Sequence, residues 1–416
     1  MEPTIKTIIE SKALSQLPRF LSNYSGKALL VADQNTHSIA GVQVGAILRE
    51  AGFAYREIVL RRPQPLVPDE HGLAEIHENL SPDTDVLLGV GSGTITDLTR
   101  YAGFKAGKPF ISLPTAPSMD GYASPVAALT LEGFKRTLPA APPVAIIADI
   151  EIIKQAPQIM IQAGLGDLLG KYTSLTDWEL GRIIEGEDYS YQIAEQVRNA
   201  VDRAICSFKN DISNETKITA LTTALIMSGE AMLAWGNSRP ASGSEHHLAH
   251  YWEMEAALRG RGDHLHGIKV GIATMIVSGY YHRLSSLTIK EIEESVTNNH
   301  YESDPDYRSR IKAVFGPLAK MILSDLDGYY SDSTLRKKRQ IEIQNNWCLL
   351  KKLVREKIPA PDQIKSILKQ AKAPWSPREI GISAAELELA LENAKEVRKR
   401  YTVFRLAEDL GWKFPM

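Results

Sequence analysis

The 416-residue sequence predicts an α/β domain over residues 1–150 followed by an all-α domain over residues 151–416. Short apolar runs alternate with amphipathic segments in the first part, which is the pattern of a parallel sheet covered by helices on both faces. After Asp149 the strand-like runs give way to long helical patterns. The length also exceeds that of one usual hydrophobic core, so two domains are expected.

Five apolar runs of the first domain are predicted to be buried strands. They are Lys27–Ala32, Tyr55–Leu60, Asp85–Val90, Phe110–Leu113 and Val144–Ala148. Helical periodicity follows the first three strands, at Gly41–Ala51, at Leu73–Leu80 and around Leu98, Tyr101 and Ala102. Within Val126–Leu138, Gly133 separates two β-prone runs and predicts a hairpin. The long helices of the second domain are expected at Tyr189–Ser207, Lys217–Ala234 and Ala384–Tyr401.

Composition excludes several classes of protein. A net charge of -2 argues against nucleic-acid binding, and the basic run Arg336–Arg339 is interpreted as a solvated helix face. Two distant cysteines, Cys206 and Cys348, form no disulfide framework and suit a reducing cytosol. The N-terminus lacks the layout of a signal peptide, and no apolar run approaches the ~20 residues of a membrane helix. A cytoplasmic protein without membrane insertion is expected.

A glycine-rich turn follows the third predicted strand, where Gly91–Asp97 reads GSGTITD and leads into a helix. Glycines at such a turn let the backbone approach a ligand, and the new helix directs its N–H groups at any anion there. This suits a dinucleotide pyrophosphate, although a plain tight turn has the same glycines. Asp33, after the first strand, could bind an adenosine ribose or cap a helix.

The fourth strand ends in a long loop, Leu113–Pro125 (LPTAPSMDGYASP), at the same edge of the predicted sheet. Loops held by a rigid scaffold commonly carry binding groups. Asp120 is therefore a candidate for substrate hydroxyls and Ser124 for a cofactor. The alternative is a loop that proline stiffens for stability alone.

Histidines concentrate in the second domain: five of the ten lie within the 21 residues from 246 to 266. An even distribution would place about 0.5 there. His246 and His250 are four residues apart and share one helix face, and a helix–turn–helix hairpin through Arg259–Asp263 could return His266 to His246. Neutral imidazole is the commonest metal ligand. The cluster predicts a metal site, although any single histidine could be a surface or core residue.

Taken together, these motifs resemble the sn-glycerol-1-phosphate dehydrogenases, within the glycerol dehydrogenase and iron-type alcohol dehydrogenase superfamily. The matching segments are GSGTITD (91–97), LPTAPSMDGYASP (113–125), AGLGDLLGKYTSLTDW (163–178), SGSEHHLAHYWEM (242–254) and HLHGIKVGIAT (264–274). The chain departs from the superfamily in HGIKV, where HGE is common, and in GSG, where GGG is usual. Together with the long C-terminal part, these departures make the chain more similar to the bacterial branch of the family than to the archaeal one.

The resemblance implies a Rossmann-like domain and a helical domain in the fold shared by dehydroquinate synthase and iron-type alcohol dehydrogenases. It implies one divalent metal, zinc or nickel, on Asp167, His246 and His266, with His250 at the position that contacts substrate. Asp167 could otherwise be a helix N-cap, and His247 and His264 match no ligand position. NAD(H) or NADP(H) is implied as cofactor, held with the help of Asp33 and Ser124. The other residues implied at the cofactor are Gly93, Thr94, Ile95, Thr96, Asp97, Thr115, Ala116, Pro117 and Ser118.

The implied reaction is reversible reduction of dihydroxyacetone phosphate, a small phosphorylated triose, to sn-glycerol 1-phosphate for glycerophospholipid or ether-lipid synthesis. The resemblance also implies a homo-oligomer, a dimer or larger. Three alternatives are a glycerol dehydrogenase, a cyclase similar to dehydroquinate synthase and a non-catalytic nucleotide-binding regulator. The intact set of Asp167, His246 and His266 argues against the regulator.

Overall fold

The computed structural model describes residues 5–62, 66–131, 134–209, 212–262, 264–299, 301–327, 329 and 332–412. The chain divides into two compact units. The first comprises residues 1–168 with 199–238, and the second comprises residues 169–198 with 239–416. The change from strands to helices falls after Asp149, where the last strand ends. The compact units are divided at other points, because part of the helical sequence belongs to the first unit.

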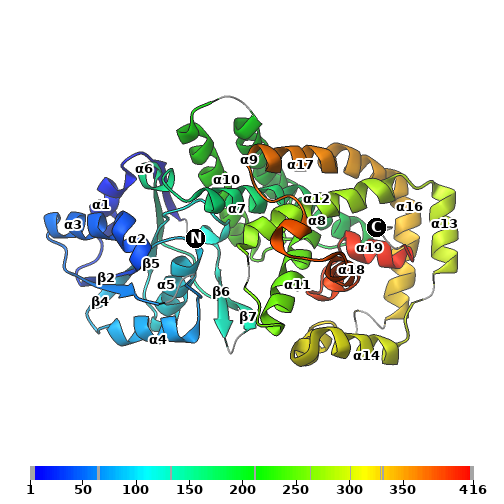
Figure 1. Cartoon of the computed structure of the whole chain (residues 1–416), viewed down its shortest axis with the longest axis horizontal. Coiled ribbons are helices and arrows are strands. Elements are labelled where there is room, and N and C mark those ends of the chain that lie inside the picture. Colours follow the sequence, from blue (N-terminus) through cyan, green and yellow to red (C-terminus); the bar gives the residue numbers. More distant parts are fainter. Residues whose placement is uncertain are drawn as a thin grey trace. The chain divides into compact units, whose positions relative to one another are not determined.

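The first unit is built on a parallel sheet of six strands in the order β1-β8-β5-β4-β2-β3. Figure 1 labels β2, β4 and β5 of this sheet. Its strands are β1 (Lys6–Glu10), β2 (Lys27–Asp33), β3 (Tyr55–Leu60), β4 (Thr84–Val90), β5 (Phe110–Leu113) and β8 (Ala145–Asp149). The five predicted strands are therefore confirmed. The structure adds β1, which pairs with β8 at the edge of the sheet. The sequence of β1, KTIIE, has a charged residue at each end, and its residues are mostly half-buried. It therefore lacks the continuous apolar run that predicts the central strands.

Helices cover both faces of this sheet. Alternate residues of β2 point to opposite faces, so that Leu30 packs in one apolar cluster and Leu29 in the other. The helical segments that follow the strands are α1 (Leu17–Leu21), α3 (Val42–Glu50), α4 (Glu70–Asn79) and α5 (Gly93–Ala106). The short turns are η1 (Ala13–Gln16), α2 (Gln34–Thr36), the π-helical η2 (His37–Gly41), η3 (Gly121–Ala123) and α6 (Ile150–Ile153).

The predicted hairpin is confirmed as antiparallel strands β6 (Val126–Leu131) and β7 (Phe134–Pro139), while Gly133 lies outside the described residues. The helix α10 (Asn214–Trp235) also belongs to the first unit. Among the described residues it alone is long and apolar enough to cross a membrane, so the expectation that no segment reaches this length is wrong. Of its most apolar stretch, 56% is buried, so these residues pack against the rest of the protein.

In the second unit, the regular secondary structure of the described residues is entirely helical. Its long helices are α8 (Lys171–Glu185), α11 (Ser244–Leu258), α12 (His266–Ser285), α13 (Ile289–Asn298), α14 (Asp304–Phe315), α15 (Ala319–Asp325), α16 (Ser333–Lys357), α17 (Pro361–Gln370), α18 (Ala384–Asn393) and α19 (Val403–Asp409). The 3-10 turns are η4 (Gly316–Leu318), η5 (Pro377–Ile380) and η6 (Ala394–Glu396). The helices α7 (Gln158–Leu169) and α9 (Tyr191–Lys209) contain two of the three boundaries at which the chain passes between the units, and the third lies between α10 and α11.

The prediction of one helix over Ala384–Tyr401 is wrong at its C-terminal end. The α-helix ends at Asn393, a 3-10 turn follows, and residues 397–402 are irregular. The Asn393 side chain accepts a hydrogen bond from Arg310 Nη1 at 2.6 Å, and Glu396 forms ion pairs with Arg310 and Arg405. These buried contacts outweigh the helical periodicity of the sequence.

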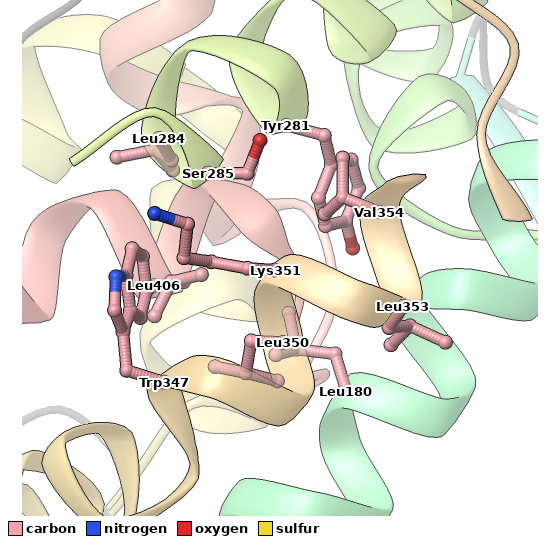
Figure 2. A pocket seen from close by; sticks show the side chains of 10 residues that line it. All are labelled: Leu180, Tyr281, Leu284, Ser285, Trp347, Leu350, Lys351, Leu353, Val354 and Leu406. Carbon is pink, nitrogen blue, oxygen red and sulfur yellow. The ribbon is translucent and has the colours of Figure 1, made fainter. Parts of the chain in front are cut away.

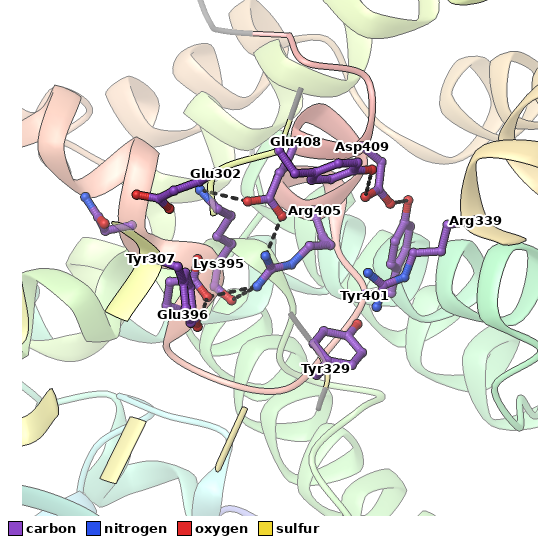
Figure 3. Close-up of polar contacts among 12 residues, drawn as sticks. Glu302, Tyr307, Tyr329, Arg339, Lys395, Glu396, Tyr401, Arg405, Glu408 and Asp409 are labelled. Atoms are coloured by element: carbon purple, nitrogen blue, oxygen red, sulfur yellow. Dashed lines mark hydrogen bonds and ion pairs between the residues drawn. The ribbon is translucent and has the colours of Figure 1, made fainter. Parts of the chain in front are cut away.

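A buried polar network stabilises this end of the second unit (Figure 3). Arg405 is 1% exposed and lies between Glu396, whose Oε2 is 3.0 Å from Arg405 Nη2, and Glu408. Arg339 belongs to the same region and binds the Glu185 carboxylate through Nε at 2.7 Å. The interpretation of residues 336–339 as a solvated face is thus wrong for Arg339, which is 2% exposed.

Candidate active-site residues

The glycine-rich turn lies at the carboxyl end of β4, a central strand of the sheet. A Cβ atom on Gly91 would lie 2.6 Å from Ile95 Cβ, so only glycine fits where the chain turns into α5. No side chain caps the N-terminus of α5 at Ser92. The turn therefore offers backbone N–H groups and a positive helix end to an anionic ligand, which fits the pyrophosphate of a nicotinamide dinucleotide.

The other residues predicted at the cofactor lie at the same edge of the sheet. Val90 of β4 pairs with Leu113 of β5, so the segment Thr115–Ser118 begins next to the turn. Asp33 ends β2, and its Oδ1 accepts hydrogen bonds from Asn35 N at 2.8 Å and from Thr36 N at 2.9 Å. The structure thus shows Asp33 as a helix cap, and its contact with ribose stays a prediction.

The loop of residues 113–125 is held by buried contacts from the rest of the first unit. Arg100 is fully buried and donates to the carbonyls of Tyr122 and Val126, at 2.9 and 2.8 Å. Its Nη1 also lies 2.8 Å from Asp97 Oδ1. The predicted cofactor residue Asp97 therefore anchors the loop through Arg100. Ser124, 3% exposed, accepts a hydrogen bond from Val126 N.

Gly164 of α7 allows this loop to lie directly on the helix. A Cβ atom there would come within 1.7 Å of the Pro117 carbonyl oxygen. We expect Gly164→Ala to destabilise the protein by at least about 2 kcal/mol, because the backbone on either side has to move. Denaturation by urea measures the change. Gly262→Ala is the control, since no atom lies within 4 Å of the added Cβ, and an equal effect of both substitutions would contradict the explanation.

Two acidic residues predicted at the metal and substrate meet within the first unit. Asp167, near the C-terminal end of α7 and 1% exposed, accepts a hydrogen bond on Oδ2 from Asp120 N at 3.0 Å. The Asp120 carboxylate in turn accepts from Ser228 Oγ at 3.0 Å. Asp167 lies within the helix, so the alternative role of N-cap is wrong. The loop backbone thus orients its carboxylate.

In the second unit, three predicted site histidines come together. His246 and His250 lie on α11, and His266 is the first residue of α12. The ring centroids are 5.2 Å apart for His246 and His266, 5.0 Å for His250 and His266, and 6.0 Å for His246 and His250. The predicted helix–turn–helix hairpin is confirmed, although Asp263 in its turn lies outside the described residues.

Buried carboxylates orient all three rings, and they were not predicted. Glu245 Oε1 lies 2.6 Å from His246 Nδ1, while the two oxygens of Glu253 lie 2.8 Å from His266 Nδ1 and 3.0 Å from His250 Nδ1. A carboxylate at Nδ1 holds the hydrogen there and leaves Nε2 as the basic atom, which is the usual arrangement around a metal-bound histidine. The donor set of this unit therefore fits a divalent metal.

Glu253 links the cluster, since its Oε1 also lies 2.9 Å from Lys269 Nζ and its side chain is 2% exposed. We expect Glu253→Gln to weaken binding of a divalent ion by about 10–100-fold, because an amide holds the imidazole hydrogens less well. Equilibrium dialysis with the ion measures the affinity. Glu255→Gln, two residues along α11, is the matched control, and unchanged affinity in Glu253→Gln would contradict the assigned role.

The N-terminus of α11 is fixed by Asp177, a buried residue of α8. Its Oδ2 accepts hydrogen bonds from Ser244 N and Oγ, both at 2.6 Å, and its Oδ1 accepts from Tyr281 at 2.5 Å. Burial and the nearby Glu245 raise the pKa of Asp177 to about 6. Ser244 is the first residue of α11, so these hydrogen bonds also fix the position of His246, two residues further along the same helix.

Two arginines beside the histidines were also missed. Arg398 contacts Ser242 Oγ at 3.5 Å and His250 Nε2 at 3.4 Å, and Arg400 Nη1 donates to the Ser242 carbonyl at 2.7 Å. They lie about 150 residues from His250 in the sequence, in the segment expected to be helical. Because of this separation, no local sequence pattern connects them with the histidine cluster.

The remaining histidines of the cluster differ from these three. His264 is exposed. His247 is fully buried, and neither ring nitrogen has a hydrogen-bond partner among the described residues. Burial first, and then Arg400 and Arg398, lower the pKa of His247 well below its usual value. It stays neutral near pH 7.

A small apolar cavity lies in the core of the second unit (Figure 2). Its lining comes from α8, α12, α16 and α19 and consists of Leu180, Tyr281, Leu284, Ser285, Trp347, Leu350, Lys351, Leu353, Val354 and Leu406. The polar ends of Trp347 and Lys351 both bond the Leu287 carbonyl. None of the three site histidines lines it, so this cavity is separate from the histidine cluster.

A family model and a solved structure show which broad class of proteins this chain resembles. Residues 8–157 match the profile described as iron-containing alcohol dehydrogenase. The fold is similar to that of a glycerol dehydrogenase from Schizosaccharomyces pombe, with a TM-score of 0.60 at 14% identity over 98% of this chain and 90% of that one. The matched segment and the similar structure together confirm the predicted fold, which is that of the iron-type alcohol dehydrogenases.

Curated relatives of higher sequence identity show the family to which the chain belongs. A glycerol-1-phosphate dehydrogenase (NAD(P)+) from Halalkalibacterium halodurans is 43% identical over 277 residues, which cover 65% of this chain and 68% of that protein. One from Geobacillus thermodenitrificans is 32% identical over 95% of this chain and 90% of its own length. The chain belongs to the glycerol-1-phosphate dehydrogenase family. The resemblance seen in the motifs is thereby confirmed.

Proposed function

We propose that the protein reduces dihydroxyacetone phosphate reversibly to sn-glycerol 1-phosphate with NADH or NADPH and one divalent metal ion. The family supports the reaction, since the relatives are named as NAD(P)+-dependent glycerol-1-phosphate dehydrogenases. The structural observation that carries the proposal is the pair His246 and His266, each with a buried carboxylate at Nδ1. Such a pair is suited to hold an ion with Nε2 while the other ring nitrogen stays fixed.

Asp167, His246 and His266 are the proposed ligands, and zinc or nickel is the proposed ion. One carboxylate and two imidazoles leave coordination positions open for a substrate. A divalent ion in this set supplies Lewis acidity to the ketone oxygen and stabilises the charge that develops as hydride arrives. The hydrogen bond from Asp120 N supports the role of Asp167, because it fixes the direction of the carboxylate.

His250 is proposed to contact the substrate and not the ion. Burial lowers its pKa to about 3, so the ring is neutral near pH 7. With Nδ1 facing Glu253, Nε2 is the accepting atom and can receive a hydrogen bond from a substrate hydroxyl or from water. A neutral ring is a poor source of protons, so we propose that water supplies the proton of the product and that His250 positions it. Asp120 is proposed to bind a second hydroxyl.

The nicotinamide dinucleotide is proposed to bind at the turn of residues 91–97 and at residues 115–118, with Asp33 and Ser124 assisting. The uncapped N-terminus of α5 supports this placement of the diphosphate. We also propose that the protein works in the cytoplasm as a homo-oligomer, and that its product enters synthesis of glycerophospholipids or ether lipids.

A coupled spectrophotometric assay tests the reaction. The protein, with each nicotinamide and with zinc or nickel, is given dihydroxyacetone phosphate, unphosphorylated dihydroxyacetone or neither. The proposal expects steady oxidation of NADH or NADPH with the phosphorylated triose in clear preference. Equal rates with both trioses would favour a glycerol dehydrogenase. No net oxidation would favour a cyclase that returns the hydride within its catalytic cycle.

A further inference from the structure

We propose that Arg398, together with the Ser242 hydroxyl, binds the phosphate group of the substrate, and that Arg400 is a positioning residue that holds Ser242. This inference rests on the proposed function, because it assigns a residue to one part of the proposed substrate. It follows from where these side chains lie, from the chemistry of the guanidinium group and from the charges around it.

The location fits a short phosphorylated ketone. Arg398 Nη2 lies 3.4 Å from His250 Nε2, the atom proposed to face a substrate hydroxyl. The ring of His250 is itself 5.0 Å from that of the proposed metal ligand His266. A triose phosphate carries its phosphate one carbon from the ketone, so a phosphate ligand has to lie about one side chain away from the ketone site. Arg398 meets this requirement, and all these residues belong to the second unit.

The chemistry fits as well. Guanidinium is planar and always charged, and it binds phosphate oxygens through two parallel N–H bonds. The contacts of Arg398 with Ser242 Oγ and His250 Nε2 are 3.5 and 3.4 Å long, at the outer limit of hydrogen bonding. The Ser242 hydroxyl can rotate with the guanidinium toward an anion, while Glu253 holds the His250 ring in place. The 2.7 Å bond from Arg400 to the Ser242 carbonyl fixes the backbone of that residue.

The surrounding charges favour an anion at this place. Among the described residues, the carboxylate that acts electrostatically on Arg398 is that of Glu253, which already binds His250, His266 and Lys269. The pKa of Arg400 is lowered by burial and then by Arg398 and Arg239, although Glu187 and Glu245 act in the opposite direction. The guanidinium groups thus repel one another in a half-buried setting. A dianionic phosphate bound to Arg398 would relieve that repulsion.

The experiment compares two substrates in wild type, Arg398→Gln, Arg398→Lys and the control Lys399→Gln. Lys399 is the exposed cation between the two arginines, so its loss changes net charge equally. We expect Arg398→Gln to lower kcat/KM for dihydroxyacetone phosphate by about 10–100-fold more than for dihydroxyacetone, mainly through KM. Arg398→Lys should recover part of this preference, and Lys399→Gln should keep all of it. An equal loss with both substrates in Arg398→Gln would show a structural role and overturn the proposal.

Calorimetric titration with inorganic phosphate needs no turnover and separates this inference from the proposed reaction. Binding by wild type and by Lys399→Gln, and at least about 10-fold weaker binding by Arg398→Gln, supports the site even if no triose is reduced. Equal binding by all variants, or no binding by wild type, would overturn the site even if dihydroxyacetone phosphate is a good substrate.

Discussion

Replacing His266 by alanine is expected to abolish reduction of dihydroxyacetone phosphate and to weaken binding of the divalent ion by more than about 100-fold. The magnitude follows because even loss of a residue that merely orients a metal ligand costs about 10–100-fold in affinity. The protein should stay folded. His266 is half-buried at the start of α12, so its removal leaves little cavity, and Glu253 keeps His250 and Lys269 as partners.

The control for this substitution is His264→Ala, two residues earlier and exposed. It removes the same side chain from the same turn, yet turnover and ion affinity should stay within about 2-fold of wild type, as for most surface substitutions. Ion content, turnover and circular dichroism are measured on both variants. If His266→Ala keeps its ion and its turnover, the assignment of the metal ligands is wrong.

Arg405→Met is expected to cause the largest loss of stability, about 3–5 kcal/mol, because it leaves carboxylates buried without their principal cation. Glu396, 1% exposed, would keep Arg310 Nη2 at 3.3 Å and the Tyr307 hydroxyl at 3.2 Å, which compensate in part. Glu408 would lose a direct ion pair. Burial raises the pKa of Glu408, but Arg405, with smaller contributions from Lys395 and Arg310, lowers it to about 2.

The matched control is Arg308→Met. Arg308 pairs with Asp304 at 2.8 Å, but both side chains are nearly half-exposed, so its loss should cost less than about 1 kcal/mol. Urea denaturation followed by near-ultraviolet circular dichroism measures both variants. Equal and small effects would show that the network of Figure 3 contributes little to stability.

Much of the fold could be predicted because its central strands are apolar on both faces. Lys27–Ala32 and Asp85–Val90 are continuous apolar runs, and a buried parallel strand has few other sequences available. The edge strand β1 was missed because Lys6–Glu10 is half-buried and begins and ends with a charge. The end of the helix at Asn393 was missed because its cause lies in Arg310, which is distant in sequence.

In the candidate site, too, local sequence patterns could be predicted and contacts between distant residues could not. The four-residue spacing of His246 and His250 is a local property of a helix, so the pattern predicted their shared face. The carboxylates that hold the rings are also near in sequence, but many acidic residues are, and only the folded hairpin selects Glu245 and Glu253. Arg398 reaches His250 through the irregular segment after Glu396. No spacing rule could have connected them.

The central claim is that His246 and His266 hold the ion on which reduction depends. The most direct measurement starts from protein freed of metal by a chelator and titrates it with zinc or nickel, following bound ion and NAD(P)H oxidation by dihydroxyacetone phosphate in parallel. We predict that both rise together and level off at one ion per chain, and that His246→Ala shows neither rise. Turnover by the metal-free protein, or ion binding that His246→Ala leaves intact, would contradict the claim.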